Sequence, residues 1–193
     1  GGSARHLREE KQRGAEIPRR LHSMGGIFAL KVCVYAICKN ESQFVDRFMD
    51  SMSEADYVCV LDTGSSDDTV ERLRARGAIV GETVVSPWRF DTARNESLGL
   101  IPADADICCA IDLDEQFHPG WRAALERAWQ PDTTRARYRY TWSFRPDGSE
   151  GMVFWADKIH KNGCYRWASP VHETLAYTGE GAERFVDAAG VQL

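Results

Sequence analysis

Short runs of β-favouring apolar residues alternate with helix-like segments between about residues 27 and 130. The apolar runs cover residues 29–37, 56–62, 78–85 and 106–112. Nearly continuous apolar runs are typical of strands covered on both faces, as in a parallel sheet. The alternation therefore predicts an α/β fold with a mainly parallel, Rossmann-like sheet flanked by helices. Ligands of such sheets bind at the carboxyl ends of the strands.

The segments between these runs have helical spacing, and residues 63–77 form the clearest predicted helix. Ser65 or Ser66 is expected to cap its start, and the two aspartates that follow suit the positive end of its dipole. Gly77 is expected to end it. Other helices are expected at residues 41–54, 91–101 and 119–129.

The pattern changes after about residue 130. Residues 135–144, 151–160 and 165–177 are strand-like and are separated by Pro-Asp-Gly and Asn-Gly turn signals. We expect a single domain over residues 24–193, with a nucleotide-binding half to about residue 130 and a smaller antiparallel or mixed β portion after it. Residues 1–23, which start with Gly-Gly-Ser and are rich in Arg and Glu, are expected to be a tag, linker or disordered extension.

Composition narrows the classes of protein that fit. The formal net charge of −5 argues against a broad basic surface for nucleic acid. The six cysteines form no CxxC pair, which favours buried, reduced thiols over a zinc site or disulfide framework and points to the cytoplasm. No apolar run approaches the roughly 20 residues that span a membrane.

The apolar run "ICCAIDLDEQF", residues 107–117, ends in a cluster of carboxylates. If the strand stays extended through Leu113, Asp112 and Asp114 project to one face while Leu113 points into the core. A hard divalent cation, Mn²⁺ or Mg²⁺, between the carboxylates would relieve their repulsion and leave coordination positions for phosphate. The alternative is a solvated acidic turn in which Asp114 caps the helix that begins near Pro119.

Five segments in this order resemble the motifs of the inverting family 2 glycosyltransferases: "VYAICKNES", "VLDTGSSDDT", "WRFDTARNESL", "AIDLDEQF" and "WASPVHETL". The resemblance covers about residues 30–178 and is closest to a small bacterial branch in which a His-Glu pair follows the D-x-D. It implies the GT-A fold and metal-dependent transfer of a sugar, with inversion, from a nucleotide-diphospho-sugar. UDP-sugar is the default donor of this family.

The resemblance also implies roles for individual residues. Binding of the nucleotide-sugar is carried over to residues of four motifs: Asn40, Glu41, Asp62, Arg94 and Asp112. Asp114 matches the firmest metal ligand of the D-x-D, and Asp112 binds ribose or reaches the metal through water.

The segment "WASPVHETL" departs from the family pattern. Related enzymes carry a Glu-Asp pair whose Asp is the general base, so by register His172 replaces the Glu and Glu173 replaces the base. His172 then becomes a candidate third metal ligand. Neighbouring residues of a regular strand point in opposite directions, so both can serve one site only if Pro170 marks a loop or kink.

The remaining expectations concern the acceptor and the alternatives. The acceptor is a glycan, lipid, peptide or modified nucleobase, and a partner or second subunit is a possible way to complete its site. Five aromatic residues are available to stack on a sugar or base, although their strand spacing favours a position in the core: Trp142, Phe144, Phe154, Trp155 and Trp167. The alternative functions are a catalytically weak sugar-nucleotide- or carbohydrate-binding module and a haloacid-dehalogenase-like phosphatase.

Overall fold

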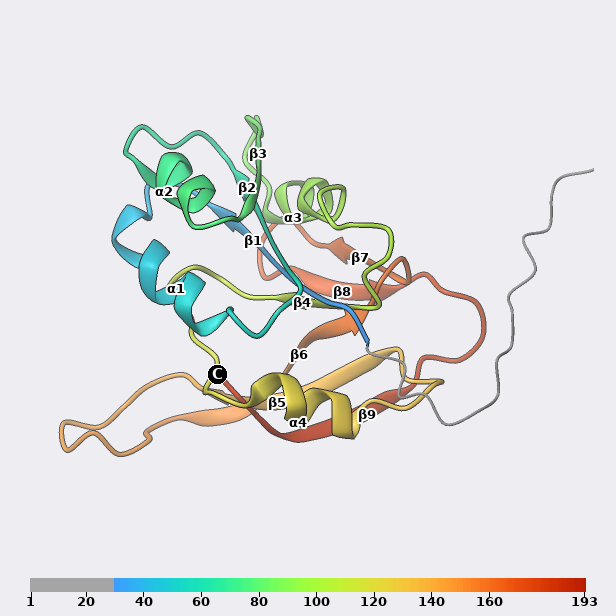
Figure 1. Cartoon of the computed structure of the whole chain (residues 1–193). Coiled ribbons are helices and arrows are strands. Elements are labelled where there is room, and N and C mark those ends of the chain that lie inside the picture. Colours follow the sequence, from blue (N-terminus) through green and yellow to red (C-terminus); the bar gives the residue numbers. More distant parts are fainter. Residues whose placement is uncertain (1–29) are drawn as a thin grey trace, which may run out of the picture.

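The computed structural model describes residues 30–193 and contains one large and one small sheet (Figure 1). The large sheet has the order β3-β2-β1-β4-β6-β5-β9, and β7 and β8 form a separate antiparallel pair. The strands have these bounds: β1 Val32–Cys38, β2 Tyr57–Asp62, β3 Ile79–Glu82, β4 Ile107–Ala110, β5 Arg135–Thr141, β6 Val153–Lys161, β7 Tyr165–Ala168, β8 Thr174–Tyr177 and β9 Phe185–Gln192. The expectation for residues 1–23 lies outside the described residues.

The first four strands are parallel, whereas β6 runs antiparallel to both β4 and β5 and β9 is parallel to β5. The predicted architecture is confirmed: a mainly parallel sheet is flanked by helices, with a smaller antiparallel part toward the C-terminus. In the part of the chain that the structure describes, no helix is long and apolar enough to cross a membrane.

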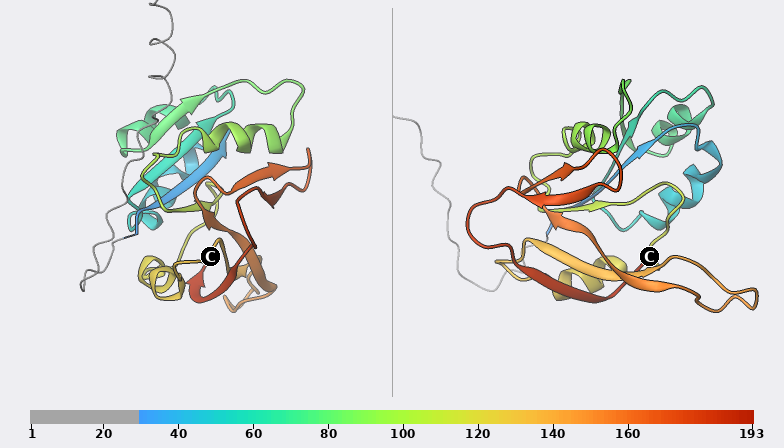
Figure 2. Two further views of the ribbon diagram at one scale, coloured as in Figure 1. Left: turned by 90° about the vertical axis from the view of Figure 1, so that its right-hand side faces the viewer. Right: turned by 180° about the vertical axis from the view of Figure 1, so that it is seen from behind.

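Strand β1 lies between two hydrophobic cores. Val32, Val34 and Ala36 face one core, whereas Cys33 and Tyr35 face the other. The first core receives apolar side chains of α1, α2 and α4, and the second receives those of the segment after α3 and of the β7–β8 pair. Figure 2 shows α3 and β7–β8 on the side of the sheet opposite to α1 and α2. Burial on both faces explains why β1 is an unbroken apolar run.

The helices are shorter than the sequence predicts. Their bounds are α1 Val45–Ser51, preceded by a 3-10 turn at Ser42–Phe44, α2 Thr69–Ala75, α3 Phe90–Leu98 and α4 Trp121–Ala128. The expected capping of α2 is wrong, because the hydroxyl of Ser65 bonds to Asp62 and that of Ser66 to Asn40, and α2 begins only at Thr69. Gly77 ends α2 as predicted: its φ is 89°, and its N–H donates to the carbonyl of Arg74.

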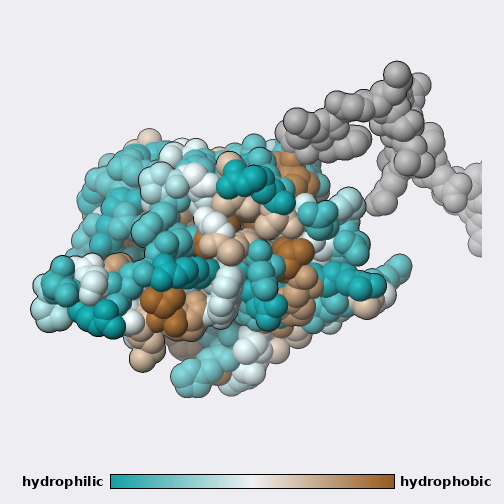
Figure 3. Space-filling view, turned by 90° about the horizontal axis from the view of Figure 1, so that it is seen from below, coloured by the Kyte–Doolittle hydropathy of each residue, from teal (hydrophilic) through white to brown (hydrophobic). Residues whose placement is uncertain are grey.

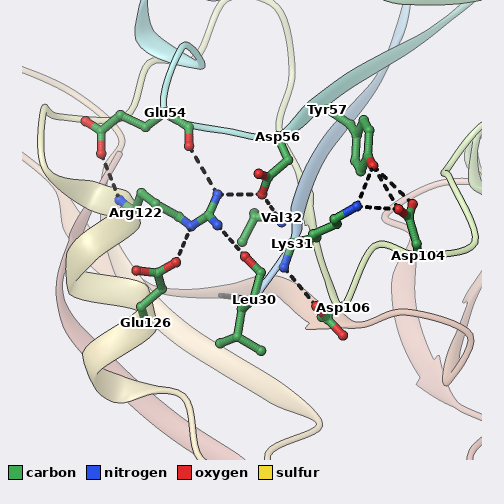
Figure 4. Close-up of polar contacts among 10 residues, drawn as sticks. All are labelled: Leu30, Lys31, Val32, Glu54, Asp56, Tyr57, Asp104, Asp106, Arg122 and Glu126. Carbon is green, nitrogen blue, oxygen red and sulfur yellow. Dashed lines mark hydrogen bonds and ion pairs between the residues drawn. The ribbon is translucent and has the colours of Figure 1, made fainter. Parts of the chain in front are cut away.

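Helix α4 is anchored by residues far away in the sequence. Glu54 accepts hydrogen bonds from the N–H groups of Gly120 (2.6 Å) and Arg122 (3.2 Å), so the alternative in which Asp114 caps this helix is wrong. Figure 4 shows the guanidinium of Arg122 donating to Asp56, Glu126 and the carbonyls of Glu54 and Leu30. These bonds fix α4 against the start of β1.

The last strand, β9, was not predicted. It lies at the sheet edge beside β5, and α4 packs across it. A Cβ on Gly190 would lie 3.0 Å from the Cβ of Ala124, so the close approach of helix and strand favours glycine there. The cysteines are free as predicted, five of them buried and Cys164 half-buried.

Candidate active site at the carboxyl ends of β1 and β4

The strand order reverses direction at β1, which pairs with β2 on one side and with β4 on the other. In open α/β sheets, ligands bind in the crevice beyond the carboxyl ends of the strands at this switch point. A cavity of about 280 Å³ lies there, and its lining includes Glu41, Arg94, Asp112 and Asp114. With Thr63, which also lines the cavity, the sheet therefore brings together residues from four of the segments singled out in the sequence.

The carboxylates reach this cavity from a turn and not from an extended strand. Strand β4 ends at Ala110, and the N–H of Glu115 donates to the carbonyl of Asp112 at 3.0 Å. Leu113 is buried as predicted, whereas Asp114 is exposed. The extended geometry assumed from the sequence is wrong, but both carboxylates still line the same cavity.

Glu115 supports this turn. Its Oε2 accepts a hydrogen bond from the N–H of Asp112 at 2.8 Å, and its Oε1 accepts one from the hydroxyl of Tyr140 at 2.7 Å. Burial, with the negative charge of Asp112 adding to it, raises the pKa of Glu115. Its contacts are directed into the protein, so Glu115 orients the turn.

Arg94 connects the two acidic segments of the site. Its Nε lies 2.6 Å from Oε1 of Glu173, and its Nη2 lies 2.9 Å from Oδ1 of Asp112. The Arg94 side chain is 4% exposed and its guanidinium lies 5.0 Å from the ring centroid of Trp167. The predicted members Arg94, Asp112 and Glu173 thus meet, through ion pairs that the sequence did not indicate.

Two charged groups at the site remain incompletely paired. Nη1 of Arg94 and Oε2 of Glu41 are buried without a hydrogen-bond partner among residues 30–193. Burial, followed by the charges of Asp114, Asp112 and Asp67, raises the pKa of Glu41 to about 7. Repulsion among oxygen donors of this kind fits a hard divalent cation, which would offset their negative charge.

Asn40 and Asp62 shape the loop after β2. Oδ1 of Asn40 accepts hydrogen bonds from the N–H and hydroxyl of Ser66, and Oδ2 of Asp62 accepts bonds from the N–H groups of Gly64 (3.0 Å) and Ser65 (2.9 Å). Burial opposes ionisation of Asp62, but the bonds from Ser65 and Gly64 outweigh it and hold its pKa below the ordinary value. Both side chains therefore hold the loop in place beside the cavity.

The loop between β7 and β8 carries the His-Glu pair. Ser169 and His172 have positive φ angles of 79° and 55°, and the carbonyl of Pro170 accepts a bond from the N–H of Phe90. The predicted loop at Pro170 is confirmed. It directs Glu173 to Arg94, while His172 is exposed. Within residues 30–193, no three His, Cys, Asp or Glu side chains form a set arranged to hold a metal, so His172 does not join Asp112 and Asp114 in one.

Three further residues at the site were not singled out from the sequence, although two of them, Trp88 and Phe90, lie in the quoted segment WRFDTARNESL. Lys158 on β6 places its Nζ 3.8 Å from Oδ2 of Asp112, because β6 pairs with β4. Trp88 and Phe90 also line the cavity, and their rings meet edge to face with centroids 5.2 Å apart. Register between distant strands, which single motifs do not encode, determines the position of Lys158.

A series of buried hydrogen bonds holds Trp167, the residue whose ring lies against the guanidinium of Arg94. The indole N–H of Trp167 donates to the hydroxyl of Tyr35 at 2.9 Å, and that hydroxyl lies 2.9 Å from Nε2 of His160. Since an indole N–H only donates, the Tyr35 hydrogen goes to Nε2 of His160, and Nδ1–H of His160 donates to the carbonyl of Lys161. These hydrogen bonds require the imidazole of His160 to be neutral.

No protein-family model matches this chain. Similar solved structures include glucosyl-3-phosphoglycerate synthase from Mycobacterium tuberculosis with Mn²⁺, UDP and glucosyl-3-phosphoglycerate, at 26% identity over 58% of this chain and 44% of that chain, with a TM-score of 0.47. The same enzyme with UDP matches at 26% identity over 61% of this chain and 45% of that one, with a TM-score of 0.48. The chain spans less than half the length of these structures. Both TM-scores lie below 0.5, so the function of this chain is inferred from its own residues and not from these structures.

Proposed function

We propose that this chain is a metal-dependent, inverting glycosyltransferase of family 2 with the GT-A fold, using a UDP-sugar as its donor. The observation that carries the proposal is the meeting of Asp112, Asp114, Arg94 and Glu173 at the switch point of the sheet. Three of the five motifs that resemble the family supply these four residues. The cytoplasmic location and the single domain over residues 24–193 stay predictions.

The proposed donor site is the cavity of about 280 Å³. Asp114, with Asp112 and His172, would hold Mn²⁺ or Mg²⁺, and His172 would need to move toward the carboxylates because it is exposed in its loop. When bound, this cation supplies Lewis-acid stabilisation of the departing diphosphate. Nη1 of Arg94 is available to a diphosphate oxygen, and Trp88 and Phe90 present rings on which a nucleobase can stack.

The loops around Asn40, Glu41 and Asp62 complete the nucleotide side of the proposed site. The side chains of Asn40 and Asp62 hold their own loop, so we assign them to its shape and to contacts made by the groups they orient. Glu41 lines the cavity directly.

Glu173 is the proposed general base. It would take the proton of the acceptor hydroxyl while the acceptor oxygen forms a bond to the anomeric carbon. The bond from that carbon to the diphosphate breaks at the same time, and its electron pair leaves with the nucleoside diphosphate. Glu173 accepts a hydrogen bond from Arg94, so base action requires Arg94 to shift its bonds toward the donor.

The ion pair between Arg94 and Glu173 also favours the second candidate, a sugar-nucleotide-binding module with weak turnover, because the base is engaged. A thermal-shift panel of nucleoside diphosphates and sugar nucleotides, with and without Mn²⁺, tests the shared binding step. Synergy between one nucleotide and the metal supports both candidates, and release of free diphosphate with sugar transfer supports the enzyme. Hydrolysis of p-nitrophenyl phosphate without synergy would support the phosphatase instead.

A further inference from the structure

A second and larger cavity, of about 670 Å³, adjoins the proposed donor site. Asp114 lines both cavities, so a molecule in the second one lies next to the carboxylate turn. Its size falls within the range of small-molecule sites. The walls come from the turn after β4, from Arg47 on α1 and from the β5–β6 hairpin.

The hairpin wall is an exposed aromatic surface. Trp142 is 64% exposed and Phe144 is 63% exposed, and both line the cavity together with Tyr140. The expectation of a core position is therefore wrong for four of the five aromatics, Trp142, Phe144, Phe154 and Trp155, whereas Trp167 is buried as expected. Figure 1 shows this hairpin extending beyond the rest of the sheet, and Figure 3 shows hydrophobic residues at the surface among hydrophilic ones on the face seen from below.

Contacts with Phe154 on the facing strand hold the rings of Tyr140 and Trp142 in place. Tyr140 faces Phe154 across the hairpin, with ring centroids 4.9 Å apart and planes 27° apart. The ring centroid of Trp142 lies 6.1 Å from that of Tyr140 and 6.4 Å from that of Phe154. The hydroxyl of Tyr140 is bonded to Glu115, which orients the carboxylate turn. Glu115 thus links the aromatic surface, through Tyr140, to the proposed metal-binding turn, through Asp112.

The charges of the side chains that line this cavity favour a neutral occupant. Arg47 is the one Arg or Lys among the described residues that line this cavity, and its Nη2 already donates to the carbonyl of Asp114 at 2.9 Å. Its guanidinium lies 4.5 Å from the ring centroid of Phe44. Among the described side chains of the lining, a phosphorylated acceptor would therefore find one Arg or Lys, which is already engaged.

We propose that the cavity walled by Trp142, Phe144 and Tyr140 binds a neutral saccharide as the acceptor of the transferred sugar, an inference that rests on the proposed transferase function. A sugar ring presents a face of C–H groups to flat aromatic rings and hydroxyls around its edge. The rings of the hairpin match the face, and the exposed Gln116 supplies an amide group at the edge.

The test compares two exposed tryptophans of the same hairpin. Trp142 lines the cavity, whereas Trp155, which is 53% exposed, pairs opposite Arg139 and does not line it. Binding is measured by ligand-observed NMR with Mg²⁺ and UDP present, using maltopentaose, cellopentaose and xylopentaose as neutral probes and glucose 6-phosphate as the anionic one. Release of UDP from a UDP-sugar without acceptor is measured for every variant.

We expect at least one neutral probe to bind, Trp142→Ala to weaken that binding tenfold or more, and Trp142→Tyr to restore most of it. Trp155→Ala is expected to match the unsubstituted chain, and all variants are expected to keep UDP binding. Equal losses in both alanine variants, binding of none of the neutral probes, or preference for the phosphate would overturn the saccharide assignment. If the unsubstituted chain neither binds UDP nor releases UDP from a UDP-sugar, the proposed donor function is overturned instead.

Discussion

Nε of Arg94 lies 2.6 Å from Oε1 of Glu173, although 79 positions separate the two residues in the sequence. The same guanidinium bonds to Asp112, so a single buried cation balances two acidic groups of the proposed site. The proposed base, Glu173, is therefore held in an ion pair with Arg94, which is both a structural and a functional residue.

Substitution of Arg94 by alanine should destabilise the fold, because it leaves Glu173 and Asp112 without their shared partner. Breaking a buried pair by removing one member costs about 3 kcal/mol. Chemical denaturation should therefore show a clear drop in the free energy of unfolding. The control is Arg74→Ala, which breaks an exposed pair with Glu82 and should cost less than about 1 kcal/mol. Equal effects of the two substitutions would contradict the buried-pair argument.

Substitution of Glu173 by glutamine should spare folding and donor binding but stop transfer. The amide oxygen still accepts a hydrogen bond from Arg94, whereas it cannot take the acceptor proton. Loss of a general base lowers turnover by about 10²-fold or more. Product formation and UDP affinity are measured together, with exposed Glu180→Gln as the matched control. Full activity of Glu173→Gln would remove Glu173 from the mechanism.

Substitution of Asp114 by asparagine should abolish the synergy between Mn²⁺ and nucleotide without harming stability. The side chain is exposed, so the free energy of unfolding should change by less than about 0.5 kcal/mol. Calorimetric titration of UDP with and without Mn²⁺ measures the synergy. Asp132→Asn, at another exposed position, should retain it. Unchanged synergy in Asp114→Asn would place the metal elsewhere.

Stability should fall as the pH drops from about 6.5 to about 4, because burial lowers the pKa of His160 to about 4. An unfolded histidine titrates near 6.5, so in this window the unfolded chain binds more protons than the folded one. The stabilisation is fully present above this window, and its loss amounts to about 3 kcal/mol at most.

Denaturation at a series of pH values measures this loss. His160→Gln should be less stable at neutral pH, because the Tyr35 contact is altered, but its stability should depend less on pH within the window. Substitution of the exposed His118 by glutamine should leave the wild-type slope. An unchanged slope in His160→Gln would show that other groups govern acid unfolding.

The sequence by itself determined the alternation of buried strands and helices, the end of α2 at Gly77 and the delivery of Asp112 and Asp114 to a strand end. These features depend on local patterns: apolar runs make doubly covered strands, and a glycine tolerates positive φ. The proposed roles of these residues come from the family resemblance and await the experiments above.

Tertiary structure alone decided which side chains meet. The ion pairs of Arg94, the position of Lys158 beside Asp112, the edge strand β9 and the exposed hairpin rings depend on strand order and register. Alternation along a strand shows which residues share a face, but whether that face is covered depends on the elements packed against it. Among the described residues, the face that carries Trp142 is left largely uncovered, and its ring, 64% exposed, lies at the wall of a cavity.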